Sequence, residues 1–585
     1  MIIRHVTPVG EASGEPTGYS ASFLRGKRDW FSQFNFGRAT RYEGWFLTNE
    51  QDEPHQFWKF LERVEIFPSK PELPESIHAT PGAIRHQYAN GRDVTFQLVT
   101  DLSIAGGMRI TCSKPSELEL NLDMRGIYLQ PDEGREYRVE SERGGYVVSY
   151  TDPTLAGTTL FLCVTSEDQL KKPEVTWKPV RYGRDAQRNS EPSNLHIVSL
   201  GTLEATDLSL GIGFSAEQAR AGARAASILK PASFETVPSA TPHQVSLYLA
   251  QTSLQYLHVS TGYYAGFPWF HQHWSRDELI TGLGLPLDQQ LTLISRYLST
   301  SMYLGELPTY AGSGTYCSDG VGWLALLIRE VGLANLPEQM KGEITTFLQG
   351  AISGLNQSRK TPTGLIWSGH NATWMDTIGR VGCRIEIQAM YGLCLQLLGE
   401  LTGSQQFEAD RQSHLETIRH NLFQEYLRDG LEDDLSLSSQ KRPNVFLAYL
   451  IQPDLLTPEQ WDATFTTTLD SCWTRWGGIT SLNWQDPAFQ KQSTGENNLS
   501  YHQGDSWFHI NCLAAIALYR HNKEMYHSVI SMLTDSACSE LLWQHYLGAP
   551  GEIASAESGA SWGCGIQGFA GGPLVKLLTE TKNEA

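Results

Sequence analysis

The sequence is poor in positive charge and contains no long hydrophobic run. Its 585 residues include 45 Lys and Arg against 64 Asp and Glu, which gives a net charge of −19. Nucleic-acid binding needs a basic surface that displaces counterions, so this balance argues against a nucleic-acid partner. No stretch approaches the roughly 18 apolar residues of a membrane span, and the first residues lack the apolar core of a signal peptide. We therefore expect no membrane partner.

Paired cysteines are also lacking. The nine cysteines are odd in number, scattered along the chain and free of any Cys-x-x-Cys spacing. A disulfide framework or a zinc site would show paired spacing, so we expect reduced thiols in a reducing compartment, and thus a cytoplasmic protein. No metal-binding constellation is visible, and we expect neither a metal nor a cofactor.

Aromatic residues, by contrast, are abundant. The chain contains 16 Trp and 23 Tyr, more than a core alone needs. Both side chains offer a flat apolar face with a polar handle, which suits sugar-binding sites. They are also common in large β-containing proteins, so the excess permits a carbohydrate site without proving one.

The period of the apolar residues divides the chain. Residues 1–215 alternate apolar and polar positions in short runs, which predicts the antiparallel strands of an all-β sandwich. Residues 216–241 predict a short Ala-rich helix followed by a Pro- and Ser-rich linker. From 242–585 the period is helical, with one continuous helix predicted at 277–300 and loops of alternating length. Alternating loop lengths favour paired helices in a toroid, whose long loops gather at one end and can build a site.

The first long loop of the helical region ends in Arg276 and Asp277 and carries Trp269 and Trp274. Asp277 could simply stabilise the start of the following helix. Alternatively, the carboxylate accepts hydrogen bonds from sugar hydroxyls and the guanidinium donates to them, while the indoles stack on the ring. Composition alone leaves the two interpretations equal.

Three further segments carry a charge or an imidazole near a helix start. Asp319 precedes a helix, where capping is the favoured interpretation. Arg384 and Glu386 stand on an otherwise apolar helix, so each needs a partner and forms either a structural ion pair or a substrate contact. His502 and Trp507 come together before another helix.

The loop at 371–380 places Asp376 beside Trp374. A catalytic acid must be held against an apolar wall to stay protonated near neutral pH, which makes Asp376 a candidate proton donor. An exposed aspartate beside a packing tryptophan is the simpler alternative. Glu552 and Glu557, in a Gly- and Ser-rich loop before the last helix, offer the second carboxylate that hydrolysis of a glycosidic bond requires.

In their order, these motifs resemble the C-terminal amylo-α-1,6-glucosidase domain of glycogen debranching enzymes, and more distantly glucoamylases. The resemblance covers residues 241–580. The matching motifs are Gly266-Phe-Pro-Trp-Phe with Trp274-Ser-Arg-Asp, Asp319 before Trp323, Thr373-Trp-Met-Asp, Ile385-Glu-Ile-Gln-Ala, Arg442-Pro-Asn, Tyr501-His-Gln-Gly with Trp507, and Glu552-Ile with Cys564 and Gln567.

The resemblance implies an all-α (α/α)6 barrel after the β-sandwich, and inverting hydrolysis of α-glucosidic bonds. It implies that Asp376 is the general acid and Glu552 the general base, in preference to Glu557, since the family's base lies in a Glu-Ile stretch. An inverting site holds its two carboxyl groups roughly 6.5–9.5 Å apart. The residues expected to bind substrate are Arg276, Asp277, Trp269, Trp274, Asp319, Trp374, Glu386, His502 and Trp507.

Three motifs depart from the family pattern. Ser275 stands where the family has Gly, Phe508 where it has Pro, and Cys564-Gly-Ile-Gln-Gly-Phe where it has Cys-Pro-x-Gln-Ala-Trp. We expect release of glucose from α-1,6 branch stubs of glycogen or branched dextrins, with an α-glucan or oligosaccharide as partner. The alternatives are a glucoamylase-like exo-acting α-glucosidase on α-1,4 or disaccharide substrates, and a catalytically silent glucan-binding protein.

Overall fold

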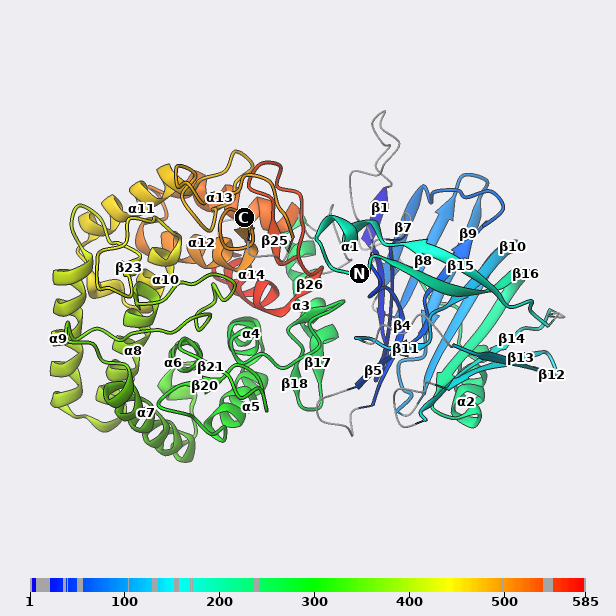
Figure 1. Ribbon diagram of the computed structural model, residues 1–585, viewed down its shortest axis with the longest axis horizontal. Coiled ribbons are helices and arrows are strands. Elements are labelled where there is room, and N and C mark those ends of the chain that lie inside the picture. The colour runs from blue at the N-terminus through cyan, green and yellow to red at the C-terminus, as the bar shows by residue number, and fades with distance from the viewer. Residues whose placement is uncertain are drawn as a thin grey trace. The chain divides into compact units, whose positions relative to one another are not determined.

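The computed structural model describes two units of the chain, shown in Figure 1. One reaches to Thr241 and the other begins at Pro242. The described residues are 3–6, 21–34, 38, 40–49, 56–80, 82–103, 105–128, 135–151, 157–168, 170, 172–234, 241–495, 499–539 and 551–582. Residues 235–240 of the predicted linker therefore lie outside them. No helix in these ranges is both long and apolar enough to cross a membrane.

The first unit contains two antiparallel sheets. The larger follows the order β1-β7-β8-β9-β10-β16-β14-β13-β12, with β6 beside β10 and β15 beside β16, and the smaller follows β11-β5-β4-β3-β2. The strands are β1 (Ile3–Val6), β2 (Ala21–Arg25), β3 (Asp29–Phe34), β4 (Gly44–Asn49), β5 (Gln56–Leu61), β6 (Arg63–Ile66), β7 (Ser76–Thr80), β8 (Ala83–Tyr88), β9 (Arg92–Leu98), β10 (Gly106–Leu122), β11 (Arg125–Gly126), β12 (Tyr137–Glu142), β13 (Gly145–Thr151), β14 (Thr159–Thr165), β15 (Thr176–Arg181) and β16 (Asn194–Gly213).

Alternating burial along these strands confirms the β-rich region that period two predicts. The two sheets contact each other through aromatic side chains, such as Phe31 and Phe96, whose rings lie 5.6 Å apart. A short helix, α1 (Gly183–Gln187), precedes β16, and α2 (Ala216–Ser227) packs on β16 and β10. Close packing of α2 requires glycine, since a Cβ at Gly222 would lie 2.1 Å from the carbonyl oxygen of Gly106.

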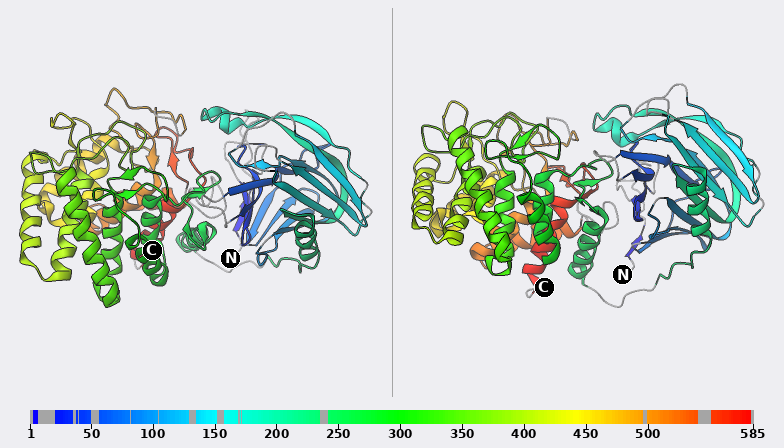
Figure 2. Two further views of the ribbon diagram at one scale, coloured as in Figure 1. Left: turned by 60° about the horizontal axis from the view of Figure 1, so that its bottom comes forward. Right: turned by 90° about the horizontal axis from the view of Figure 1, so that it is seen from below.

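The second unit is helical (Figures 1 and 2). Its helices are α3 (Pro242–Leu257), α4 (Ser275–Thr281), α5 (Leu287–Leu298), α6 (Gly320–Val331), α7 (Glu338–Ser358), α8 (Ile385–Thr402), α9 (Gln405–Leu422), α10 (Asn444–Ile451), α11 (Pro458–Cys472), α12 (Phe508–Asn522), α13 (His527–Ser539) and α14 (Gly568–Glu580), with 3-10 turns η1 (Gly282–Gly284), η2 (Leu333–Asn335) and η3 (Pro453–Leu455). The even-numbered helices α4, α6, α8, α10, α12 and α14 contact one another in that order, and α14 returns to α4. The odd-numbered helices pack against members of this closed series.

The predicted continuous helix at 277–300 is wrong. The chain forms α4, the turn η1 and then α5, with Pro286 at the N-cap of α5. Gly284 lies against α14, where a Cβ would come 2.4 Å from the carbonyl oxygen of Gly572. The apolar period continues through this break because both segments bury leucines, so period alone could not reveal it.

Two-residue strand pairs tie the loops of the helical unit together. The pairs are β17 (His258–Val259) with β18 (Gly262–Tyr263), β19 (Gly266–Phe267) with β26 (Ile566–Gln567), β20 (Leu307–Pro308) with β21 (Tyr316–Cys317), β22 (Cys383–Arg384) with β23 (Gly430–Leu431), and β24 (Ser506–Trp507) with β25 (Ile553–Ala554). Since β22, β24 and β26 run directly into α8, α12 and α14, these pairs fix the loops against the first turns of the inner helices.

Candidate active site

A cavity of about 560 Å³ lies among these loops. Seven of the predicted site residues line it, drawn from loops far apart in the sequence: Trp274, Arg276, Asp277, Trp374, Asp376, Trp507 and Glu552. The structure thus brings the two candidate catalytic carboxylates into one cavity. Within the described chain, no group of three or more His, Cys, Asp or Glu residues could hold a metal ion. All nine cysteines are free and buried.

Four predicted substrate-binding residues do not line the cavity: Trp269, Asp319, Glu386 and His502. Asp319 and Glu386 are fully buried and bind arginines instead. A buried charge needs an internal partner, so these two residues act on the site through their neighbours. Of the two interpretations of Glu386, a structural ion pair or a substrate contact, the structure supports the ion pair.

Asp376 lies on a loop whose two ends are joined by hydrogen bonds between the backbones of Ser368 and Gly382. Asn371 enters this loop with a positive φ of 57°, a conformation that asparagine tolerates. The Asp376 side chain is 33% exposed, so a substrate in the cavity can reach it. Burial raises the pKa of Asp376 above its ordinary value, against the lowering effect of the Arg276 guanidinium. A raised pKa is what a general acid requires.

Arg276 connects Asp376 to the first turns of two helices. From α4, its Nε donates to Asp319 Oδ2 at 2.6 Å and its Nη1 to Asp376 Oδ2 at 3.2 Å. The capping role favoured for Asp319 is wrong, because its side chain caps no backbone amide of α6. It accepts instead from Arg276 and from the indole of Trp323, and so orients the guanidinium toward the cavity.

Asp277 lies in the first turn of α4 and lines the cavity. It is 8% exposed, and burial raises its pKa to about 7 despite the neighbouring Arg276 charge. The amide of Gln567 donates to its Oδ1 at 3.3 Å, which brings the start of α14 to the same wall. A carboxylate of this kind can accept hydrogen bonds from sugar hydroxyls.

Glu552 is buried and held by two donors. The backbone N–H of Cys564 donates to its Oε2 at 2.9 Å, and the Tyr501 hydroxyl donates to its Oε1. Gly563 leaves room for this carboxylate, since a Cβ there would lie 2.4 Å from Oε2. Glu557, by contrast, pairs with Lys491 at the surface and does not line the cavity. The geometry therefore favours Glu552 over Glu557 as the second carboxylate.

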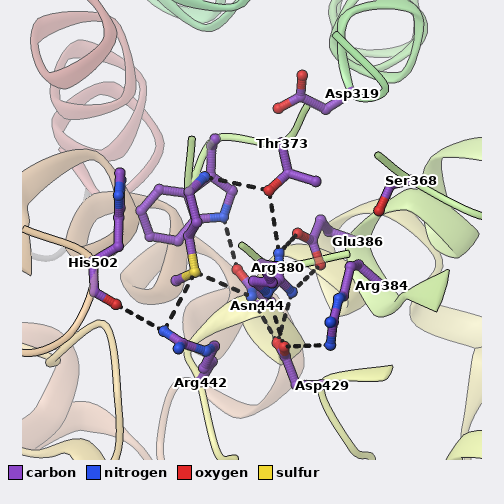
Figure 3. Close-up of polar contacts among 12 residues, drawn as sticks. Asp319, Ser368, Thr373, Arg380, Arg384, Glu386, Asp429, Arg442, Asn444 and His502 are labelled. Atoms are coloured by element: carbon purple, nitrogen blue, oxygen red, sulfur yellow. Dashed lines mark hydrogen bonds and ion pairs between the residues drawn. The ribbon is translucent and has the colours of Figure 1, made fainter. Parts of the chain in front are cut away.

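A buried polar network lies beneath the Asp376 loop (Figure 3). Arg380, at the end of the loop, pairs with Asp429 at 2.8 Å and with Glu386, and donates to Thr373 Oγ1 at the start of the loop. Asn444, on α10, donates to Asp429 at 2.7 Å and accepts from the Trp374 indole at 2.8 Å. Both ends of the loop are thus anchored to the same acidic group.

The pKa of Asp429 shows how strongly this network binds its charge. Burial would raise the pKa, yet Arg380 and further arginines lower it to about 2. Arg384 reaches the same carboxylate at 3.8 Å and pairs with Glu432 at 2.6 Å. Arg442 donates to the backbone oxygens of Ser481 and His502, both at 2.8 Å, and so joins two more loops to the network.

Aromatic rings form one wall of the cavity. Trp374 meets Trp507 edge to face at 5.5 Å, and Trp507 stacks on His502 at 4.7 Å. Sequence reasoning did not select several cavity residues, including Tyr501, His509, Gln567 and Phe569. Tyr501 and Gln567 belong to motifs that the family shares. His509 is a polar residue in an otherwise apolar helix start, and this pattern could have identified it.

A sequence model of the amylo-alpha-1,6-glucosidase family matches residues 251–576, which is more than half of the chain. The chain belongs to this family. It is therefore a glycoside hydrolase, as the ordered motifs predicted. A search of curated proteins finds no match.

Two solved structures resemble this chain to different degrees. A bacterial glucoamylase in complex with acarbose aligns with a TM-score of 0.61 at 10% identity, covering 100% of this chain and 97% of that one. The family member thus shares the glucoamylase-like fold. A GH63 mannosylglycerate hydrolase from Thermus thermophilus, in complex with Tris, aligns with a TM-score of 0.45 at 11% identity over 57% of this chain and 100% of that one.

The residues that differ from the usual family motifs lie at the starts of three inner helices. The hydroxyl of Ser275 donates to the carbonyl oxygen of Pro308 at 2.7 Å, which ties the start of α4 to β20. Phe508 and Phe569 occupy the first turns of α12 and α14, and Phe569 lines the cavity. The sequence of this chain therefore differs from the family pattern at the cavity wall built by α12 and α14.

Proposed function

We propose that this glycoside hydrolase releases glucose from α-1,6-glucosidic branch stubs of glycogen or branched dextrins, with inversion at the anomeric carbon. The observation that carries the proposal is that Asp376 and Glu552 line one aromatic-walled cavity. Two carboxyl groups on opposite sides of a glycosidic bond are sufficient machinery for its hydrolysis. Family membership supports the α-1,6 linkage.

In this proposal Asp376 protonates the glycosidic oxygen as the bond to the anomeric carbon breaks. Its raised pKa keeps the proton available at higher pH than an ordinary aspartate allows. Glu552, oriented by Tyr501 and the Cys564 amide, takes a proton from the attacking water. Product release leaves Glu552 protonated and Asp376 ionised, and exchange with solvent restores both.

The other cavity residues position the sugar. Arg276 and Asp277 offer a donor and an acceptor to hydroxyl groups, and Trp274, Trp374 and Trp507 offer apolar faces. The closed series of inner helices supports an (α/α)6 barrel following a β-sandwich, as does the glucoamylase alignment. Free, buried thiols are compatible with a cytoplasmic protein.

Activity of two matched variants tests the catalytic roles. Asp376→Asn and Glu552→Gln should each lower glucose release from a limit dextrin by at least about 10²-fold, since each removes a proton-transfer group. Glu557→Gln is the control and should keep wild-type turnover, because Glu557 lies at the surface. Near-wild-type activity of either cavity variant would refute the role of that residue.

Hydrolysis of α-1,4-linked or disaccharide glucosides is the second candidate, which the altered motif at Phe569 favours. A panel of limit dextrin, linear maltooligosaccharides and α-linked disaccharides separates the two functions. We expect the limit dextrin to be the preferred substrate, with β-glucose as the first product by NMR. Faster hydrolysis of linear chains would favour the second candidate function. α-Glucose as the first product would exclude inversion.

A further inference from the structure

His509 is a buried histidine in the wall of the cavity. It is the second residue of α12, is 1% exposed, and lines the cavity. Neither of its ring nitrogens has a hydrogen-bonding partner among the residues that the structure describes. Buried polar groups are almost always paired, because leaving one unpaired costs its lost hydration. A ligand in the cavity is the partner that this position can reach.

Three aromatic rings surround the imidazole. Trp374, Trp507 and Phe569 meet it edge to face, with centroid separations of 5.1, 5.5 and 4.5 Å. The face of an aromatic ring is electron-rich, so it can weakly accept an N–H. It cannot donate to the lone pair of the other nitrogen. The aromatic wall can therefore satisfy at most one of the two nitrogens.

The protonation state of His509 defines what it can offer. Burial, and then the charge of Arg276, hold its pKa well below the ordinary value, so the ring is neutral. A neutral imidazole has one N–H donor and one unprotonated acceptor nitrogen. The acceptor needs an O–H or N–H donor, and a sugar presents hydroxyl groups that can donate.

We propose that His509 is a specificity-determining residue that accepts a hydrogen bond from one hydroxyl group of the bound sugar. The inference rests on the proposed function, since it requires a sugar in this cavity. Arg276 and Asp277 recognise hydroxyl groups through charges, whereas His509 does so as a neutral group within an apolar wall. A substrate without the contacted hydroxyl leaves the acceptor unpaired and binds less well.

The test combines enzyme variants with substrate variants. The substrates are one α-glucoside that the wild type hydrolyses and its monodeoxy analogues, each lacking one hydroxyl of the terminal glucosyl unit. The variants are His509→Phe, which keeps a ring of similar size without polar atoms, and His509→Gln, which restores an acceptor. Thermal unfolding of each variant establishes that it is folded.

We expect one monodeoxy analogue to lose about 10-fold in kcat/KM with the wild type, as for one lost hydrogen bond. His509→Phe should lose a similar factor on the parent glucoside and show no further loss on that analogue. His509→Gln should recover part of the discrimination. The double comparison isolates the hydrogen bond, because a purely structural effect of the substitution would lower activity on all analogues equally.

Two outcomes would count against the inference. If His509→Phe is folded and ranks all the analogues as the wild type does, His509 does not recognise a hydroxyl, while the proposed function stands. The same conclusion follows if neither variant folds and no analogue is discriminated by the wild type. If the wild type hydrolyses no α-glucoside, the proposed function fails, and binding of acarbose to the intact protein then shows whether the cavity accepts a sugar at all.

Discussion

Asp277 and Asp429 are both buried carboxylates, yet their pKa shifts are opposite. Burial raises the pKa of Asp277 to about 7, whereas the arginines around Asp429 overcome burial and lower its pKa to about 2. The pKa shifts differ because the neighbouring guanidinium groups form their hydrogen bonds with different partners. Arg276 directs its hydrogen bonds to Asp319 and Asp376, while Arg380 pairs directly with Asp429.

The comparison separates a carboxylate that lines the cavity from a carboxylate that holds the loop beneath it in shape. A carboxylate in the cavity has bonding capacity left for a ligand, at a cost in stability. A carboxylate in the network beneath the loop uses that capacity on arginines and stabilises the fold. Burial alone does not distinguish them, so the sign of the pKa shift is the more informative property.

Asp429→Asn should have the largest effect on stability, because it removes the carboxylate that pairs with Arg380 beneath the loop. Removing one partner of a buried ion pair costs about 3–5 kcal/mol. The unfolding midpoint in urea should fall accordingly at neutral pH, and kcat should fall with it as the Asp376 loop loosens. Since the depressed pKa contributes stability that is lost as pH falls from about 4 toward 2, the difference from wild type should shrink in acid.

Asp376→Asn is the matched control for that experiment. The side chain is partly exposed, so we expect loss of activity with a change in unfolding free energy of less than about 1 kcal/mol. Equal destabilisation by the two substitutions would show that the loop and the network beneath it do not differ as the comparison states.

Asp277→Asn should have an intermediate effect of opposite sign. A carboxyl whose folded-state pKa is raised to about 7 loses stability as pH rises from about 4 to 7, because the folded protein holds its proton more tightly. The variant should therefore be more stable than wild type by at least about 1 kcal/mol at pH 8 and similar to it at pH 4. Calorimetric unfolding at both pH values measures the difference. Lower stability at pH 8 would contradict the prediction.

Asp319→Asn is followed through the pH dependence of activity, where we expect the smallest shift of the series. The Asp319 charge raises the pKa of Asp376, and Asp319 also holds Arg276. Its removal should lower the pKa of Asp376, so the alkaline limb of kcat/KM should move to lower pH by roughly half a unit. Asp376 must be protonated to act, which fixes the sign. If the alkaline limb of kcat/KM stays in place or moves to higher pH, Asp319 does not raise the pKa of Asp376.

Local pattern predicted the strand-rich and helical regions because burial repeats every two or 3.6 residues. It failed at Gly282–Gly284, where the reason for the break is a contact with α14, nearly 300 positions away in the chain. A second distant contact precedes α14. The segment before α14 pairs as β26 with β19, which only the folded chain brings near.

The candidate site divides in the same way. Asp376 and Glu552 could be found because they belong to ordered motifs. The neighbours Asp277 and Glu278 look alike in sequence, yet Asp277 lines the cavity while Glu278 accepts hydrogen bonds from Arg296 and Tyr297. The roles of Asp429 and Asn444 could not be predicted, because each bonds to residues that are distant in the sequence. Which charge faces the substrate is decided by tertiary contacts that spacing does not encode.

The β19–β26 pair links the first loop of the helical unit to the start of its last helix. During synthesis, Asp376 and Trp374 therefore leave the ribosome long before Glu552, Gln567 and α14. Glu552, Gln567 and Phe569 all line the cavity, so premature termination before them would remove part of its wall. The cavity is thus complete only after the two distant ends of the helical unit have met.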